Sequence, residues 1–152
     1  IRAIISTSCG VVYFCFGKSR AIVVAARYGF NDIIGIDIAR AICNGAGQNI
    51  KNVESLYPPA KFKVICDDVV NYKVESNTNF FFFFNPFDEV VMLKVVKNIL
   101  ASLKEKSRKI YIIYVNPVHK EIFESAGFEE EYYERKQKYI ELSILSNEDQ
   151  EE

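Results

Sequence analysis

The sequence predicts an α/β fold of the Rossmann-like, doubly wound kind, with a mostly parallel seven-stranded sheet that ends in an antiparallel hairpin. Two observations support this prediction. Short apolar runs, typical of buried parallel strands, alternate with stretches of helical periodicity over most of the chain. The last two strand-like stretches, residues 129–135 and 139–145, instead follow each other directly, as the strands of a hairpin do.

The first predicted unit is a strand, a helix and a second strand. A continuous apolar run at residues 11–16 is typical of a strand that is buried on both faces. The hydroxyl of Ser19 is expected to cap the following helix by accepting an otherwise unpaired backbone N–H. Gly29 fits the left-handed turn that ends such a helix, and residues 33–38 then form the second strand.

Five further segments continue the alternation. A helix over residues 39–50 precedes a strand at residues 61–66. The five consecutive phenylalanines of residues 80–84 suit only a strand that is covered on both faces, because an exposed run of this kind would promote aggregation. Apolar residues at helical spacing predict a helix over residues 88–103, and residues 110–115 form the next strand.

Composition limits the classes of function. The 152 residues, 49% of them apolar, suffice for one domain with a buried core, which we expect over residues 1–147, before an acidic tail at residues 148–152. The net charge of −1 gives no sign of the basic face that nucleic-acid binding requires, so nucleic acid is not an expected partner. No apolar run is long enough to cross a bilayer and no signal-peptide pattern opens the sequence, which predicts a cytoplasmic domain without a membrane partner.

The four cysteines stand at positions 9, 15, 43 and 66, without a Cys-x-x-Cys pair, and His119 is the single histidine. This spacing argues against a zinc site and against a disulfide framework, and it favours a reducing compartment. We therefore predict no metal site. We expect His119 to have a surface role rather than a catalytic one.

Polar residues follow each of the predicted parallel strands. Gly17 and Asp37 are one short βαβ unit apart, the spacing at which a helix N-terminus holds one end of a nucleoside cofactor while an acid accepts its ribose hydroxyls. Asp68 follows the third strand, Asn85 the fourth and Asn116 the fifth. Because ligands of open α/β sheets bind beyond the carboxyl ends of the strands, these residues are expected to form one site.

The order of these features resembles that of the class I S-adenosylmethionine-dependent methyltransferases, over about residues 11–145. The element Asn85-Pro86-Phe87 and the segment 112–120 resemble a small prokaryotic branch of that family, which is similar in turn to lysine methyltransferases that lack a SET domain. The resemblance implies S-adenosylmethionine as the cofactor. It implies a methyl acceptor, a protein or a small-molecule amine, whose identity the sequence leaves open together with the oligomeric state.

The resemblance also implies roles for individual residues. Gly17 would place its backbone against the methionine end of the cofactor, Asp37 would bind the ribose, and Asp68 would reach the adenine amino group. Asn85 would accept a hydrogen bond from the target amine, and Phe87 would stack on the substrate or shield the sulfonium. The residues assigned to the cofactor are Tyr13, Cys15, Gly17, Ser19, Asp37, Ile38, Asp68 and Val69, and those assigned to catalysis are Asn85, Pro86 and Phe87.

Three positions depart from the pattern of that family. Tyr13 stands where the family has an acid, Cys15 where it has glycine, and Ser19 where it has glycine or another small residue. A Cβ at Cys15 would reach into the space that close approach of the cofactor requires, so we expect weakened affinity. The first alternative is therefore a degenerate methyltransferase-fold domain that serves as an interaction module. The second is half of a nicotinamide-binding dehydrogenase, which shares the βαβ arrangement.

Structural explanations stand beside the functional ones. A turn-forming role for Asp68 competes with adenine contact. Asn85 has the alternative of ending its strand through an Asx turn. For Asn116, which precedes Pro117, we favour a structural role.

Overall fold

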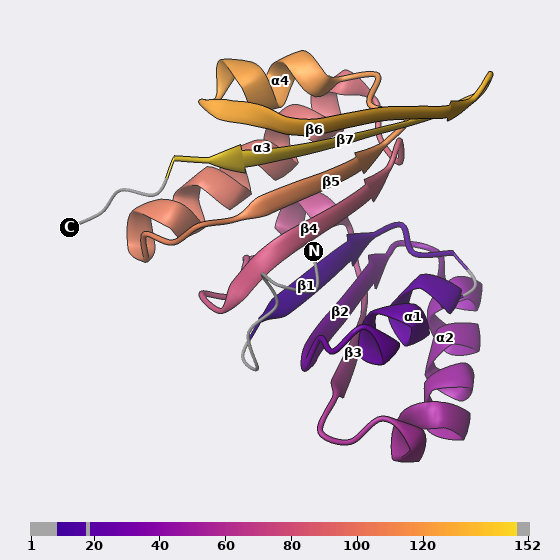
Figure 1. Cartoon of the computed structure of the whole chain (residues 1–152). Coiled ribbons are helices and arrows are strands. Elements are labelled where there is room, and N and C mark those ends of the chain that lie inside the picture. Colours follow the sequence, from indigo (N-terminus) through magenta and orange to yellow (C-terminus); the bar gives the residue numbers. More distant parts are fainter. Residues whose placement is uncertain (1–8, 18, 149–152) are drawn as a thin grey trace.

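The structure, a computed structural model, describes residues 9–17 and 19–148, in which one seven-stranded sheet carries α-helices on both faces (Figure 1). The strands are β1 (Gly10–Phe14), β2 (Asp32–Asp37), β3 (Lys61–Cys66), β4 (Thr78–Phe84), β5 (Tyr111–Val115), β6 (Phe128–Gln137) and β7 (Ile140–Asn147). The helices are α1 (Arg20–Arg27), α2 (Arg40–Val53), α3 (Glu89–Glu105) and α4 (Lys120–Ser125), with short 3₁₀ turns η1 (Glu54–Leu56) and η2 (Val69–Asn71). The lead-in at residues 1–8, Lys18 and the tail after residue 148 lie outside the described residues.

The strands lie in the order β3-β2-β1-β4-β5-β7-β6. β1 to β5 pair in parallel, whereas β7 is inserted antiparallel between β5 and β6. The predicted fold class is therefore confirmed, including the C-terminal hairpin. The alternation of strands and helices predicts this result because each parallel connection needs a crossover, while β6 and β7 are joined by a short turn.

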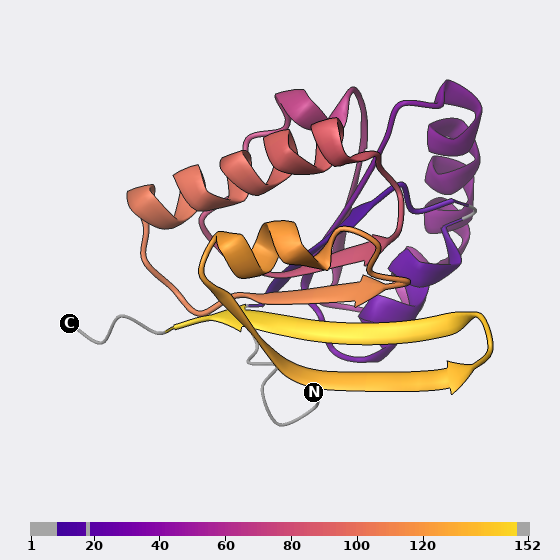
Figure 2. The ribbon, with the colours of Figure 1, turned by 90° about the horizontal axis from the view of Figure 1, so that it is seen from above.

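Two apolar layers cover the sheet, because successive side chains of a strand point to opposite faces. Val12 and Phe14 of β1 pack in the layer beneath α3 and α4, which lie side by side on that face (Figure 2). Val11 and Tyr13 belong to the other layer, together with residues of α1 and α2. The C-terminal part of β1 is thus packed against an apolar layer on each face of the sheet.

The phenylalanine run forms most of β4. Phe80, Phe81 and Phe83 are buried and Phe82 is half-buried, as predicted for a strand between two layers. Phe84 differs, since its side chain is 57% exposed at the end of the strand. No helix in the described part of the chain is long and apolar enough to cross a membrane.

Some predicted boundaries and one predicted contact are wrong. β1 ends at Phe14, two residues earlier than expected, because Cys15 turns into the left-handed region with φ of +54°. Ser19 precedes α1, but its side chain makes no capping hydrogen bond, since its own φ is +64° rather than extended. α2 continues to Val53, whereas Gly29 has the predicted left-handed conformation, with φ of +99°.

Candidate functional site

The candidate site lies at the edge of the sheet where β1 to β5 end. These strands are parallel, so the residues after them come together at one edge, the one to which the β4 and β5 arrows of Figure 1 point. Cys15 follows β1, Asp37 ends β2, and Asp68 follows β3. Asn85 follows β4 and Asn116 follows β5. The structure therefore brings the predicted polar residues to the same edge.

The loop between β1 and α1 has the backbone conformation of a glycine loop, although it contains one glycine. Cys15, Gly17 and Ser19 all have positive φ, of +54°, +59° and +64°. Left-handed backbone costs a residue with a Cβ about 1–2 kcal/mol, so neighbouring contacts must hold Cys15 and Ser19 there. For Cys15, the backbone N–H donates to the carbonyl oxygen of Ile36 over 2.9 Å, which extends the pairing of β1 with β2.

Ser19 is held from α2. Its side chain is buried, and its Oγ accepts a hydrogen bond from Asn49 Nδ2 over 2.9 Å. Two cavities lie next to this loop: one of about 280 Å³ between the loop and α2, and one of about 440 Å³ between α1 and α2. Asn49 lines both of them, Gly17 lines the smaller and Ser19 the larger.

Tyr13 of β1 and Cys15 after it, which are also predicted to bind the cofactor, differ in exposure. Tyr13 is buried, and its ring lies 4.9 Å from that of Phe82. Burial raises the pKa of the Tyr13 hydroxyl to about 12. Cys15 is exposed as a residue, yet partial burial of its thiol and the charge of Asp37 raise its pKa to about 11. Both groups are therefore protonated and uncharged near neutral pH. Neither supplies the negative charge of the acid that the family pattern has in place of Tyr13.

Asp37 is the buried carboxylate of the site, with 5% of the residue exposed. Its Oδ1 accepts a hydrogen bond from the backbone N–H of Ala39 over 2.9 Å, so the carboxylate is oriented by the turn that leads into α2. Its carbonyl oxygen accepts hydrogen bonds from the backbone N–H of Asp67 and the thiol of Cys43. Ile38 comes next and is 69% exposed, which leaves an apolar surface beside a fixed acid.

Asp68 forms a turn. Its Oδ1 accepts a hydrogen bond from the N–H of Val70 over 3.1 Å and thereby caps η2. The preceding Asp67 accepts from the N–H of Asp68 over 2.7 Å. Val69 is buried in the core beneath α3, so its side chain is directed away from solvent. The structural role that we weighed for Asp68 is present, and it fixes the position of the carboxylate at the edge.

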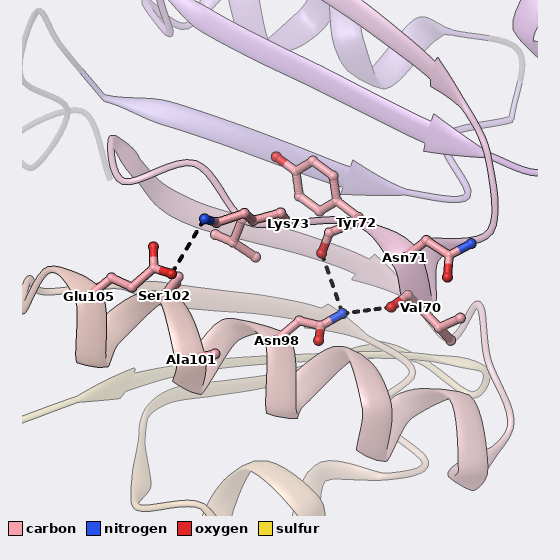
Figure 3. Close-up of a pocket in the computed structure, with 9 residues that line it drawn as sticks. Val70, Asn71, Tyr72, Lys73, Asn98, Ala101, Ser102 and Glu105 are labelled. Carbon is pink, nitrogen blue, oxygen red and sulfur yellow. Dashed lines mark hydrogen bonds and ion pairs between the residues drawn. The ribbon is translucent and has the colours of Figure 1, made fainter.

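Asn98 of α3 holds η2 in place through hydrogen bonds to its backbone, as Figure 3 shows. Its Nδ2 donates to the carbonyl oxygens of Val70, over 2.9 Å, and of Tyr72, over 3.4 Å. These residues line a cavity of about 250 Å³ together with Lys73 and Glu105, which form an ion pair over 3.5 Å. None of the predicted site residues lines this cavity, so it is not part of the candidate site.

The predicted catalytic element lies between β4 and α3. Asn85 is exposed and has a φ of +38°, and Pro86 and Phe87 are half-buried. The Phe87 ring meets the rings of Phe14 and Phe83 edge-on, at centroid distances of 5.9 and 6.4 Å. The apolar core therefore holds Phe87 in place and leaves Asn85 at the surface.

Asn116 has the structural role that we predicted. Its backbone N–H donates to the carbonyl oxygen of Glu141 over 2.8 Å, and its Oδ1 accepts from the N–H of Glu141 over 3.1 Å. The residue thus joins the end of β5 to β7. His119 lies just before α4, 3.8 Å from a carboxylate oxygen of Glu121. Among the described residues, no group of three or more histidine, cysteine and acidic side chains is arranged to hold a metal ion.

Sequence reasoning missed three residues that shape this edge. Phe84, the last residue of β4, and Val118, which follows β5, are 57% and 61% exposed, so this edge also carries apolar surface. The position of Phe84 directly before Asn85-Pro86, at the end of the predicted strand, could have indicated that it is exposed. No local feature of the sequence distinguishes Val118. Asn49, which fixes Ser19 from 30 residues away, has no local signal either.

The chain is similar to known proteins in its structure. No protein-family model matches the sequence, and no curated protein matches it. A ribosomal protein L11 methylase from Lactobacillus delbrueckii is 14% identical, with a TM-score of 0.69 over 97% of this chain and 74% of that one. An rRNA methylase from Streptococcus thermophilus is also 14% identical, with a TM-score of 0.67 over 96% and 91%.

A third similar structure contains the cofactor. It is the magnesium protoporphyrin IX methyltransferase of Synechocystis with bound S-adenosylmethionine, 12% identical, with a TM-score of 0.64 over 91% of this chain and 69% of that one. Others are described as S-adenosylmethionine-dependent methyltransferases, from Aquifex aeolicus and Corynebacterium glutamicum. The chain therefore has the Rossmann-like fold of the S-adenosylmethionine-dependent methyltransferases.

Proposed function

We propose that the protein is an S-adenosylmethionine-dependent methyltransferase that methylates a nitrogen atom of a protein or of a small-molecule amine. The observation that carries this proposal is the position of Asp37: a buried, oriented carboxylate ends β2 on the same edge as a left-handed loop and the exposed Asn85. Such a carboxylate suits vicinal ribose hydroxyls, since a charged acceptor forms the stronger hydrogen bonds. The fold is one that holds this cofactor in other proteins.

The residues present fit the cofactor in most respects. A Cβ built on Gly17 would meet no atom within 4 Å, so the space beside the loop is open to a ligand. Asp37 uses Oδ1 to bind Ala39, and we assign its second carboxylate oxygen to the ribose. Exposed Ile38 offers an apolar surface for the purine, and Asp68, held by η2, is assigned to the adenine amino group. Val69 would contribute through its backbone, because its side chain is in the core.

When bound, the cofactor supplies a methyl group that its sulfonium already activates. The chain's own residues therefore need to position the acceptor rather than to provide strong acid–base catalysis. We assign the Asn85 side chain to accept a hydrogen bond from the target amine. Pro86 and Phe87 hold the backbone of Asn85, since Phe87 is packed against Phe14 and Phe83. The exposed ring of Phe84 suits an acceptor with an apolar part.

A degenerate domain that acts as an interaction module is the second candidate, and Tyr13 favours it. Its ring is packed against Phe82 in the position where the family pattern has an acid, and the exposed Cys15 has a Cβ where that pattern has glycine. The nicotinamide alternative is disfavoured by topology. Doubly wound dinucleotide-binding sheets have the order 3-2-1-4-5-6, whereas β7 lies antiparallel between β5 and β6 here.

Calorimetric titration of the purified chain tests the proposal. S-adenosylmethionine and S-adenosylhomocysteine are titrated separately, with NADH as the control ligand. Saturable binding of either cofactor form without NADH binding supports a methyltransferase and justifies a screen of amines and lysine-bearing proteins for methyl transfer. Absence of binding at millimolar ligand would make the interaction module the leading function, and NADH binding alone would favour the dehydrogenase.

A further inference from the structure

Two cysteines lie at the turn that places Asp37. Cys66 ends β3 directly opposite Asp37 in the parallel pairing with β2, and Cys43 lies near the start of α2. The Cys43 thiol donates to the carbonyl oxygen of Asp37, with Sγ 3.3 Å away. The Cys66 Sγ lies 4.0 Å from the carbonyl oxygen of Ile38. The two thiols therefore bind successive carbonyls of one turn.

The two thiols are neighbours at this turn, although 23 positions separate them in sequence. They lie against adjacent carbonyl oxygens, and Cys66 is among the groups that raise the pKa of Cys43. Their exposure differs, since Cys66 is exposed and Cys43 is 7% exposed. A small disulfide in solvent therefore reaches the Cys66 thiol first, because Cys43 is covered.

We propose that Cys43 and Cys66 form a reversible dithiol–disulfide site that responds to low-molecular-weight disulfides such as glutathione disulfide. The inference goes beyond the proposed function, because the reaction requires these two cysteines and no cofactor. It adds a covalent modification site next to the residue that we assign to the ribose.

The reaction proceeds in two exchanges. The Cys66 sulfur, as its thiolate, forms a bond with one sulfur of the small disulfide, whose S–S bond breaks and whose other half leaves as a thiol. The Cys43 sulfur then attacks the Cys66 sulfur, and the second half of the small disulfide leaves as a thiol. The protein loses two electrons and two protons, and the small disulfide gains both.

The second exchange is expected to be the slower one. Burial and the neighbouring Cys66 sulfur raise the pKa of Cys43, so little of it is thiolate near neutral pH. The rate of cross-linking should consequently rise with pH. The product no longer has either S–H donor at the carbonyls of residues 37 and 38, and it ties the start of α2 to the end of β3.

Mass spectrometry of the full chain tests the site. The reduced protein is incubated with glutathione disulfide, quenched with N-ethylmaleimide and digested with trypsin. Cleavage at lysine and arginine places Cys43 in the peptide of residues 41–51, Cys66 in that of residues 64–73, and Cys9 and Cys15 together in a third peptide. A cross-link between the first two is therefore distinct from every other pairing.

The expected result is a mass loss of two hydrogen atoms, a cross-linked pair of peptides 41–51 and 64–73, and reversal by dithiothreitol. Cys66→Ser should abolish the cross-link, while Cys15→Ser, which removes the other exposed thiol, should retain it. Stable mixed disulfides on Cys66 with Cys43 alkylated, or a cross-link to the third peptide, would overturn the proposal. Failure of the reduced protein to bind S-adenosylmethionine would contradict the proposed function and leave this site intact.

Discussion

Asn49 of α2 donates a hydrogen bond to Ser19 over 2.9 Å between Nδ2 and Oγ, and this contact fixes the end of the loop that precedes α1. Ser19 is in the left-handed region, so its hydroxyl is turned away from the capping position. The loop that we assign to the cofactor is thus held by the second crossover helix rather than by the helix that follows it.

Replacement of Asn49 should therefore loosen this loop. We expect Asn49→Ala to lower the free energy of unfolding by about 1 kcal/mol, the usual value of one hydrogen bond, and to lower Tm by about 2–4 °C. Thermal unfolding followed by circular dichroism measures this. Asn44→Ala, at an exposed position on the same helix, is the control. An equal effect of both variants would mean that the Ser19 contact contributes nothing specific.

Loss of the Asp37 carboxylate should weaken cofactor binding. A charged acceptor contributes about 1.5–3 kcal/mol, so Asp37→Ala should raise the Kd for S-adenosylhomocysteine by about 10- to 150-fold in calorimetry. Asp32→Asn is the matched control, because Asp32 begins the same strand at the opposite edge and binds Asn77. Unchanged affinity in Asp37→Ala would remove this residue from the site.

Cys15→Gly should improve both stability and affinity. Glycine adopts φ of +54° without the steric cost of a Cβ, which predicts a gain of about 1 kcal/mol in unfolding free energy. The same change opens the space beside the loop, so the Kd for S-adenosylmethionine should fall. Cys15→Ala retains the Cβ but lacks the thiol, and it should reproduce neither gain. Identical behaviour of the two variants would contradict the backbone explanation.

Asn85 should matter for methyl transfer and not for the cofactor. Asn85→Gly keeps the left-handed backbone without strain, so the Kd for S-adenosylhomocysteine should stay within about twofold. Formation of S-adenosylhomocysteine in the presence of an accepted amine should fall by about 100-fold, as for loss of one positioned hydrogen-bonding group. Asn116→Gly is the comparison: it removes the Oδ1 contact with Glu141 and should lower stability instead. Lost stability in Asn85→Gly together with lost methyl transfer in Asn116→Gly would contradict the roles that we assign to the two asparagines.

Tyr13 should contribute to alkaline unfolding. Burial raises its pKa from 10.0 to about 12, so the folded state holds the phenolic proton more tightly than the unfolded state does. The contribution of Tyr13 to the free energy of unfolding is fully present below about pH 10. It is lost as the pH rises towards 12, and the total loss is about 2–3 kcal/mol. Urea unfolding across this range should show a shallower loss of stability for Tyr13→Phe than for the unaltered protein. Parallel curves would show that Tyr13 is not the group responsible.

The sequence predicted the order of the elements because their signals are local. The apolar run of β1, the helical spacing in α3 and the phenylalanines of β4 each report burial within a few residues. The edge on which Asp37, Asp68 and Asn85 gather also followed, since parallel strands end at the same edge. The roles of these residues toward a cofactor and an acceptor stay predictions.

Tertiary contacts decided what local patterns could not. Ser19 was predicted to cap α1, but the bond from Asn49 and the left-handed backbone give it another partner. Phe84 was predicted to be covered, yet it is exposed at the end of β4.

The sequence by itself determined the fold class and the edge that carries the site, because periodicity and strand direction are properties of the chain. Only the tertiary structure determined that Cys15 and Ser19 take up glycine-like backbone conformations and that Cys43 and Cys66 both lie against the turn at Asp37. These features depend on contacts between residues far apart in sequence. Their free energies arise only once the sheet and α2 have packed together.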